Sequence, residues 1–207
     1  MRYLLPALFL LMACFYYAFQ RLKTTPGHSK PLSVILKCAA TSMAVLAALL
    51  GCLQNGIAAH WVLLAGLIAC TIADGVLCFH FIAGGAVFAL GHVLYMIAFC
   101  LMNRPNWYSV ILFLALMGFA TAAFTRFRQR IGRRYAFFYA YATVLCLMAS
   151  LAAAQRPLYF AGALLFALSD ALLGYLLIDR NHVRLDWFSL GVYYLGQFLL
   201  ALAVCVS

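Results

Sequence analysis

Long apolar runs recur along the entire chain, and each is roughly 17 to 22 residues in length. A helix of that length crosses a hydrocarbon core about 30 Å thick, because each residue adds about 1.5 Å. The segments between the runs are short, so backbone polar groups at membrane depth can be satisfied within helices. We therefore expect an all-α membrane protein, a bundle of about eight transmembrane helices forming one polytopic domain over residues 1–207. The predicted spans are 3–19, 33–52, 61–79, 83–102, 107–125, 135–154, 158–178 and 187–206.

The composition excludes a soluble globular protein. Hydrophobic residues make up 68% of the chain and charged residues only 9%, which is too few charges to cover a water-facing surface. Nearly all of the eight cysteines fall within predicted spans, and no close pair has metal-ligand spacing. We interpret the cysteines as small packing residues and expect neither a metal nor a cofactor.

Basic residues lie mainly on one side of the eight-span arrangement. Eleven of the fourteen Lys and Arg residues fall on that side, and cationic residues accumulate in cytoplasmic loops. This asymmetry predicts that both termini lie outside the cytoplasm. We expect a multi-pass protein of a bacterial inner membrane. Anionic membrane lipids explain the net charge of +10 more simply than nucleic acid does. The eleven are Arg21, Lys23, Lys30, Lys37, Arg126, Arg128, Arg130, Arg133, Arg134, Arg180 and Arg184; the other three are Arg2, Arg104 and Arg156.

Two of the four acidic residues lie inside predicted spans, where a charge costs at least about 2.5 kcal/mol unless it faces protein or water. At about 1.5 Å per residue, Asp74 and Asp170 lie roughly 20 Å and 18 Å from the outer ends of their spans. We therefore expect both carboxylates to point into the bundle at one depth. Hydrogen bonds that only join helices are the alternative. Asp179 and Asp186 belong to the last cytoplasmic loop and are expected to be solvated.

Other polar residues share this depth or a neighbouring helical face. His92 lies roughly 14 Å from the cytoplasmic end of the fourth span, and Tyr95 follows on the same face. In the last span, Gln197 lies three and four residues after Tyr194 and Tyr193, so these residues can line the same cavity. Lys30 can bind a phosphate as a point charge, or it belongs to the ordinary positive-inside charge.

A weak internal repeat accompanies these residues. Leu168-Ser169-Asp170 is followed by a loop and a Tyr/Gln helix, much as Ile72-Ala73-Asp74 is followed by a His/Tyr helix. Four spans separate the two aspartates, which predicts two parallel halves of four helices with the site between them.

Several short motifs together are similar to one known family, the YhhN-like (TMEM86) integral membrane proteins, whose characterised members are lysoplasmalogenases. The resemblance covers most of the chain, and its one departure is Ala73, where the family usually has Gly. The motifs are Ser29-Lys30-Pro31-Leu32, Asp74, the run Phe81, Gly84, Phe88, His92 and Tyr95, then Tyr141 and Met148, Gly162-Ala163-Leu164-Leu165-Phe166 with Ser169-Asp170, and Tyr193, Tyr194 and Gln197.

The resemblance implies hydrolysis of the vinyl ether bond of a lysophospholipid, the lysoplasmalogen, to a fatty aldehyde and glycerophosphoethanolamine or glycerophosphocholine. Asp74 and Asp170 are then the catalytic pair, one as acid and the other as base in an order that the sequence does not specify, because the reaction needs a proton donor for the β-carbon and a group that orients water. A proton-coupled transporter uses similar acids in two repeated halves and is the main alternative. The Gly-x-Gly-Asp of an intramembrane aspartyl protease is absent. The residues implied around the substrate are Lys30, His92, Tyr95, Tyr141, Ser169, Tyr194 and Gln197.

Overall fold

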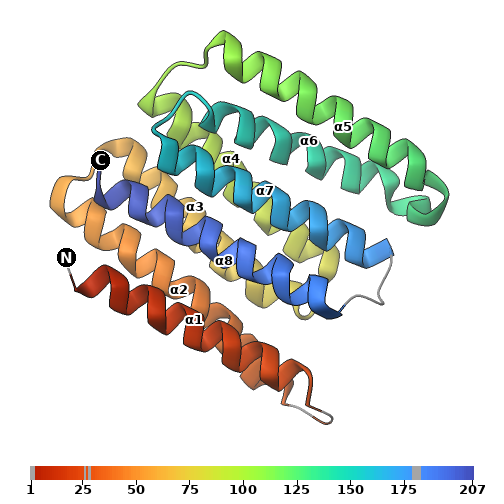
Figure 1. Cartoon of the computed structure of the whole chain (residues 1–207), viewed down its shortest axis with the longest axis horizontal. Coiled ribbons are helices and arrows are strands. Elements are labelled where there is room, and N and C mark those ends of the chain that lie inside the picture. Colours follow the sequence, from red (N-terminus) through yellow and green to blue (C-terminus); the bar gives the residue numbers. More distant parts are fainter. Residues whose placement is uncertain (1–2, 26, 28, 179–182) are drawn as a thin grey trace.

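The computed structural model describes residues 3–25, 27, 29–178 and 183–207, so Arg2, Asp179 and Arg180 lie outside the described residues (Figure 1). Within these ranges the chain is helical and has no strand. The prediction of a helical membrane bundle is confirmed, and each predicted span coincides with one α-helix. The helices are α1 Leu4–Lys23, α2 Lys30–Asn55, α3 Ala58–Leu77, α4 Phe81–Met102, α5 Trp107–Ile131, α6 Tyr135–Ala152, α7 Pro157–Ile178 and α8 Val183–Cys205, with a 3-10 turn, η1, at Gly132–Arg134.

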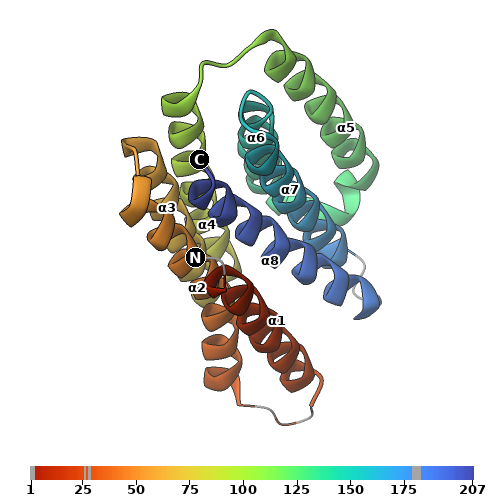
Figure 2. The same cartoon turned by 60° about the vertical axis from the view of Figure 1, so that its left-hand side comes forward.

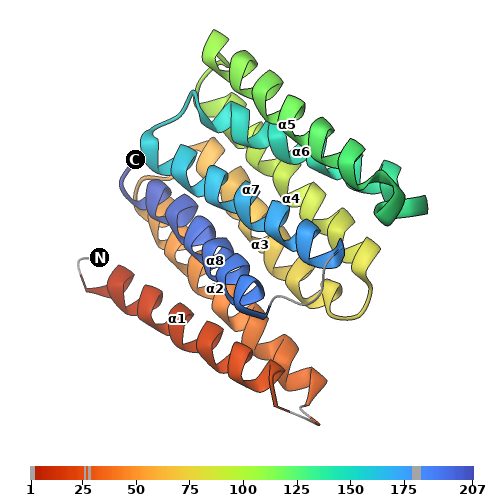
Figure 3. The same cartoon turned by 45° about the vertical axis from the view of Figure 1, so that its right-hand side comes forward.

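Seven helical segments of the described chain are long and apolar enough to cross a membrane, which makes this a multi-pass membrane protein. One of them, Trp107–Ala152, contains both α5 and α6. The chain reverses between these two helices, which lie side by side at the edge of the bundle (Figures 2 and 3).

Helix α5 continues six residues past its predicted end at residue 125. Arginine is a good helix former, and Arg128 and Arg130 in the last turn suit the negative end of the helix dipole. The helix stops at Gly132, whose φ of 63° is readily adopted only by glycine. The sequence interpretation ended the helix too early because it treated the arginines as loop residues.

The two halves of the chain repeat the same pattern of helix contacts. Helices α1 and α2 pack together as α5 and α6 do, and α3 packs on α4 as α7 packs on α8. Between the halves, α2 contacts α8 and α6 contacts α4. Helices α1 and α5 lie at opposite edges and run in the same direction (Figure 1). This is the arrangement that a parallel repeat of four helices requires.

A pair of glycines marks the same crossing point in each half. A Cβ on Gly91 would lie 3.2 Å from the Gly66 carbonyl oxygen, and a Cβ on Gly196 would lie 2.9 Å from that of Gly162. The backbones of α3 and α4, and of α7 and α8, therefore approach closely, as small residues permit in membrane helices. Gly66 and Gly162 each precede an aspartate, Asp74 or Asp170, by eight residues. The crossings thus fix both acids at equivalent positions.

Both chain ends lie at one end of the bundle (Figure 1). The last turns of α1 and α5, together with η1, carry basic residues at the opposite end. Many large apolar side chains on the outside are exposed, among them Leu10, Ile35, Leu53, Leu114 and Phe119. An apolar outer surface is what lipid-facing helices require.

Candidate functional site

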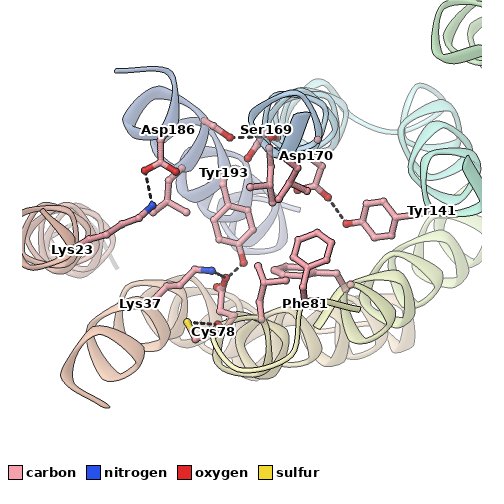
Figure 4. A pocket seen from close by; sticks show the side chains of 18 of the residues that line it. Lys23, Lys37, Cys78, Phe81, Tyr141, Ser169, Asp170, Asp186 and Tyr193 are labelled. Atoms are coloured by element: carbon pink, nitrogen blue, oxygen red, sulfur yellow. Dashed lines mark hydrogen bonds and ion pairs between the residues drawn. The ribbon is translucent and has the colours of Figure 1, made fainter. Parts of the chain in front are cut away.

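A cavity of about 360 Å³ lies in the half of the bundle that ends in the basic turns. It is lined by the last turns of α1, α3 and α7 and by the first turns of α2, α4, α6 and α8 (Figure 4). Most of its wall is apolar, and its volume falls within the usual range of about 300–1,000 Å³ for ligand sites. Asp74 and Asp170 both line it, so the fold brings the two predicted acids to one cavity.

Asp74 is surrounded by donors from two other helices. The ammonium nitrogen Nζ of Lys37 lies 3.0 Å from Oδ1, and the hydroxyls of Thr41 and Tyr193 donate to Oδ2 over 2.5 Å and 2.8 Å. The side chain of Asp74 is 1% exposed and that of Lys37 10%. A buried carboxylate must be paired and hydrogen-bonded. The two hydroxyls supply hydrogen bonds to Oδ2, whereas Oδ1 has no hydrogen-bond partner among the described residues and is compensated by the Lys37 charge.

Asp170 has different partners. The hydroxyl of Tyr141 donates to its Oδ2, and His92 Nε2 lies 3.5 Å from the same oxygen. His92 Nε2 also lies 3.2 Å from the Tyr141 hydroxyl. No lysine or arginine of the described chain pairs with Asp170. This carboxyl group therefore faces a phenol and an imidazole, whereas Asp74 faces a fixed cation.

His92 is fully buried behind Tyr141, and its Nδ1 has no hydrogen-bond partner within the described structure. Orphaned buried N–H groups are rarer than unpaired buried acceptors, so a ring proton on Nε2, where partners are present, fits these contacts best. In that form Nε2–H donates toward Tyr141 and Asp170. His92 itself does not line the cavity, but it contacts Tyr141 and Asp170, which do.

A chain of hydrogen bonds reaches Asp74 from the centre of the bundle. The Tyr95 hydroxyl donates to Gln197 Oε1 over 3.0 Å, and Gln197 Nε2 donates to the Tyr193 oxygen over 3.1 Å. Tyr193 in turn donates to Asp74. Tyr95 and Gln197 are completely buried, so they position Tyr193 without touching the cavity themselves.

Of the remaining predicted residues, one lines the cavity and two do not. Ser169 lines it, and its carbonyl oxygen accepts from the Ser189 hydroxyl. Tyr194 is buried and donates to the backbone carbonyl of Lys37 over 3.3 Å. Lys30 is exposed at the first position of α2 and is not among the lining residues.

The environment of Lys37 differs from the one that the sequence predicted. The positive-inside count placed it among the cytoplasmic cations, but it is only 8% exposed and forms an ion pair inside the bundle. The count of basic residues was misleading for Lys37, because it assigned each residue to the nearer end of its span and did not ask whether the side chain lies inside the bundle. Lys37 already fell inside the predicted span 33–52, where an ionisable residue normally marks a functional site. Nothing in the sequence indicated that Thr41, one turn further along α2, belongs to the site.

The two carboxylates occupy corresponding places in the repeat. Asp74 on α3 takes partners from α2 and α8, and Asp170 on α7 takes partners from α6 and α4. These are equivalent helices of the two halves. The arrangement of helices is thus repeated, but the side chains that contact the two carboxylates differ.

Comparison with known proteins found a match to one family model. No curated protein and no solved structure matches the chain. Within the described residues, no cluster of three or more His, Cys or Asp side chains could hold a metal ion. Residues 32–204 match the family model described as the YhhN family, which covers most of the chain. The chain therefore belongs to the YhhN family.

Proposed function

We propose that this protein is a lysoplasmalogenase, which hydrolyses the vinyl ether bond of alkenyl lysophospholipids to a fatty aldehyde and a glycerophospho-base. The observation that carries the proposal is the pair of carboxylates with unlike partners on a single, mostly apolar cavity. Membership of the YhhN family is compatible with this activity.

The two carboxylates suit two different tasks in this reaction. Asp170, which has no cation beside it among the described residues, is the proposed proton donor to the β-carbon of the enol ether. Protonation produces an oxocarbenium ion. Asp74, paired with Lys37, is the proposed base that removes a proton from the attacking water. The product of this step is a hemiacetal.

The hemiacetal then collapses with both carboxyl groups in reversed roles. Asp170 takes the proton of the new hydroxyl, and Asp74 returns its proton to the departing glycerol oxygen. The aldehyde and the alcohol form, one water is consumed, and both carboxyl groups regain their starting forms. A negative carboxylate on the cavity wall also stabilises the positive oxocarbenium ion.

The apolar wall suits the alkenyl chain. Phe19, Phe81, Phe88 and Phe138 line the cavity together with leucines of α3, α7 and α8. Burying such a chain stabilises the complex by roughly 0.8 kcal/mol per methylene group. Tyr141 and Ser169, which line the same wall, are the proposed polar contacts to the glycerol part.

A proton-coupled transporter also fits two repeated halves with one acid each. The two activities separate in one experiment, because only the hydrolase releases aldehyde from a lysoplasmalogen when purified in detergent without a sealed vesicle. Absence of aldehyde in that assay would contradict the proposed function.

Substitution of the carboxylates tests the mechanism. Asp74→Asn and Asp170→Asn should each lower kcat by about 10²–10⁴-fold, because each removes acid or base catalysis. The double variant should be scarcely slower than either single one, because the two groups act as a unit. His92→Gln should have a milder effect, since His92 does not line the cavity.

Ser150→Ala is the matched control, because Ser150 is a buried polar residue of α6 whose hydroxyl donates to the Cys146 carbonyl of the same helix and which is not among the residues that line the cavity. It should retain wild-type turnover. Wild-type turnover in either Asn variant would refute the paired-carboxylate mechanism.

A further inference from the structure

The cavity has an ion pair at its mouth. Lys23, the last residue of α1, and Asp186, in the first turn of α8, both line the cavity (Figure 4). Lys23 Nζ lies 2.7 Å from Asp186 Oδ2, and the two side chains are 45% and 32% exposed. Asp186, expected from the sequence to be solvated in a loop, is therefore part of the cavity rim.

Stability alone gives little reason for this pair. An exposed ion pair contributes about 0–1 kcal/mol, because water screens it and both side chains, here a long lysine and an aspartate, must be ordered. Its position is more informative than its strength, since it presents one cation and one anion side by side at the opening of a mostly apolar cavity. A bound group that carries the opposite charges in the same order can replace both partners at once.

We propose that Lys23 and Asp186 form the head-group site, and that it takes a zwitterionic phospho-base. The phosphate of the substrate binds Lys23, and its ammonium group binds Asp186, so the head group exchanges places with the internal ion pair. The inference rests on the proposed function, because it assigns the head group of that lipid. It selects phosphoethanolamine or phosphocholine over a bare phosphate or an uncharged glycerol.

The three other cations of α1 and α2 are less suited to the phosphate. Lys37 is held by Asp74 and is nearly buried. Lys30 is exposed and does not line the cavity. Arg21 packs over the ring of Tyr17, with its guanidinium carbon 5.9 Å from the ring centroid.

The shape of the substrate agrees with this placement. In a lysoplasmalogen the glycerol carbons alone separate the vinyl ether oxygen from the phosphate ester. The cavity is lined by Lys23 and Asp186 at its rim and by Asp74 and Asp170 further inside. A head group at the rim therefore remains in contact with water while the vinyl ether enters the site of the two carboxylates.

The experiment compares four substrates that share one alkenyl chain and carry phosphoethanolamine, phosphocholine, bare phosphate or no group on the glycerol. Aldehyde release is measured for the purified wild type, for Lys23→Ala and Asp186→Ala, for the double variant that carries both of these substitutions, and for Lys30→Ala. Arg21→Ala is the matched control, since it removes a cation from the same helix end outside the cavity.

Wild type should show the lowest KM for the two zwitterionic lipids. Lys23→Ala should raise KM about tenfold or more for lipids that carry phosphate and leave the KM of the uncharged lipid unchanged. Asp186→Ala should remove the preference for a zwitterion over a bare phosphate. Neither should change kcat much, because the head group is bound equally in ground and transition states. Arg21→Ala should resemble wild type.

Several outcomes would overturn the head-group site while leaving the hydrolase intact. Equal KM for all four lipids in the wild type is one. A lower Tm in Lys23→Ala with an unchanged substrate preference would show that the pair only joins α1 to α8. A larger KM effect in Lys30→Ala than in Lys23→Ala would move the phosphate contact to α2. Failure of the proposed function is distinguishable, since the wild type would then release no aldehyde from any of the four.

Discussion

Replacing Lys37 by methionine should destabilise the protein because it leaves the Asp74 carboxylate buried beside an apolar side chain. The ion pair spans 3.0 Å between side chains that are 10% and 1% exposed. At an effective dielectric constant of 20, two charges at this separation attract by about 5.5 kcal/mol. Removing one partner of a buried pair typically costs about 3–5 kcal/mol. Thr41 and Tyr193 still donate to Asp74, so we expect about 3 kcal/mol.

The double variant Lys37→Met with Asp74→Asn removes both charges and should recover stability to within about 1–2 kcal/mol of the wild type, because neutral replacement of a whole buried pair is often tolerated. Its activity should not recover, since Asn cannot act as a base. Reversible unfolding in mixed detergent micelles measures the stability, and aldehyde release measures the activity. Two results would refute a desolvated ion pair at this position. One is a loss of unfolding free energy below about 1 kcal/mol in Lys37→Met, and the other is a loss in the double variant that exceeds the summed losses of the two single variants.

Two further predictions concern packing and topology. Gly196→Ala should lower stability by about 1–3 kcal/mol in a thermal unfolding assay, because the new methyl group would lie 2.9 Å from the carbonyl oxygen of Gly162. Gly118→Ala is the control: nothing lies within 4 Å of its Cβ, so the change should be neutral or stabilising by up to about 1 kcal/mol. Reporter fusions should place both termini outside the cytoplasm and the region 126–134 inside it, and a cytoplasmic C-terminus would contradict the orientation.

The sequence predicted those parts of the site that are costly to keep in a membrane. Asp74, Asp170 and His92 stand out because an ionisable side chain inside an apolar run must face protein or water. The apolar runs located every helix for a similar reason, since span length is set by the bilayer. Burial against lipid thus leaves a clear pattern in the residues themselves.

Other parts depended on how the helices are rotated and paired, which hydropathy does not specify. The pairing of Lys37 with Asp74 requires α2 and α3 to meet with particular faces, and counting charges toward one side concealed it. The contact of Lys23 with Asp186 joins residues that are 163 positions apart in the sequence. Neither residue lies near the other in any local motif, so only the packing of α1 against α8 reveals the pair.

The repeated scaffold has a consequence for how two like carboxyl groups come to differ. In a symmetric dimer of identical four-helix chains, every residue would occur twice in the same surroundings, so both aspartates would face the same partner. A single chain is free of that restriction. Here α2 supplies a lysine to one carboxylate while α6 supplies a tyrosine to the other, although the helices that hold them are arranged alike. Because the two halves belong to one chain, the two carboxylates can have different partners although the helices around them are arranged alike.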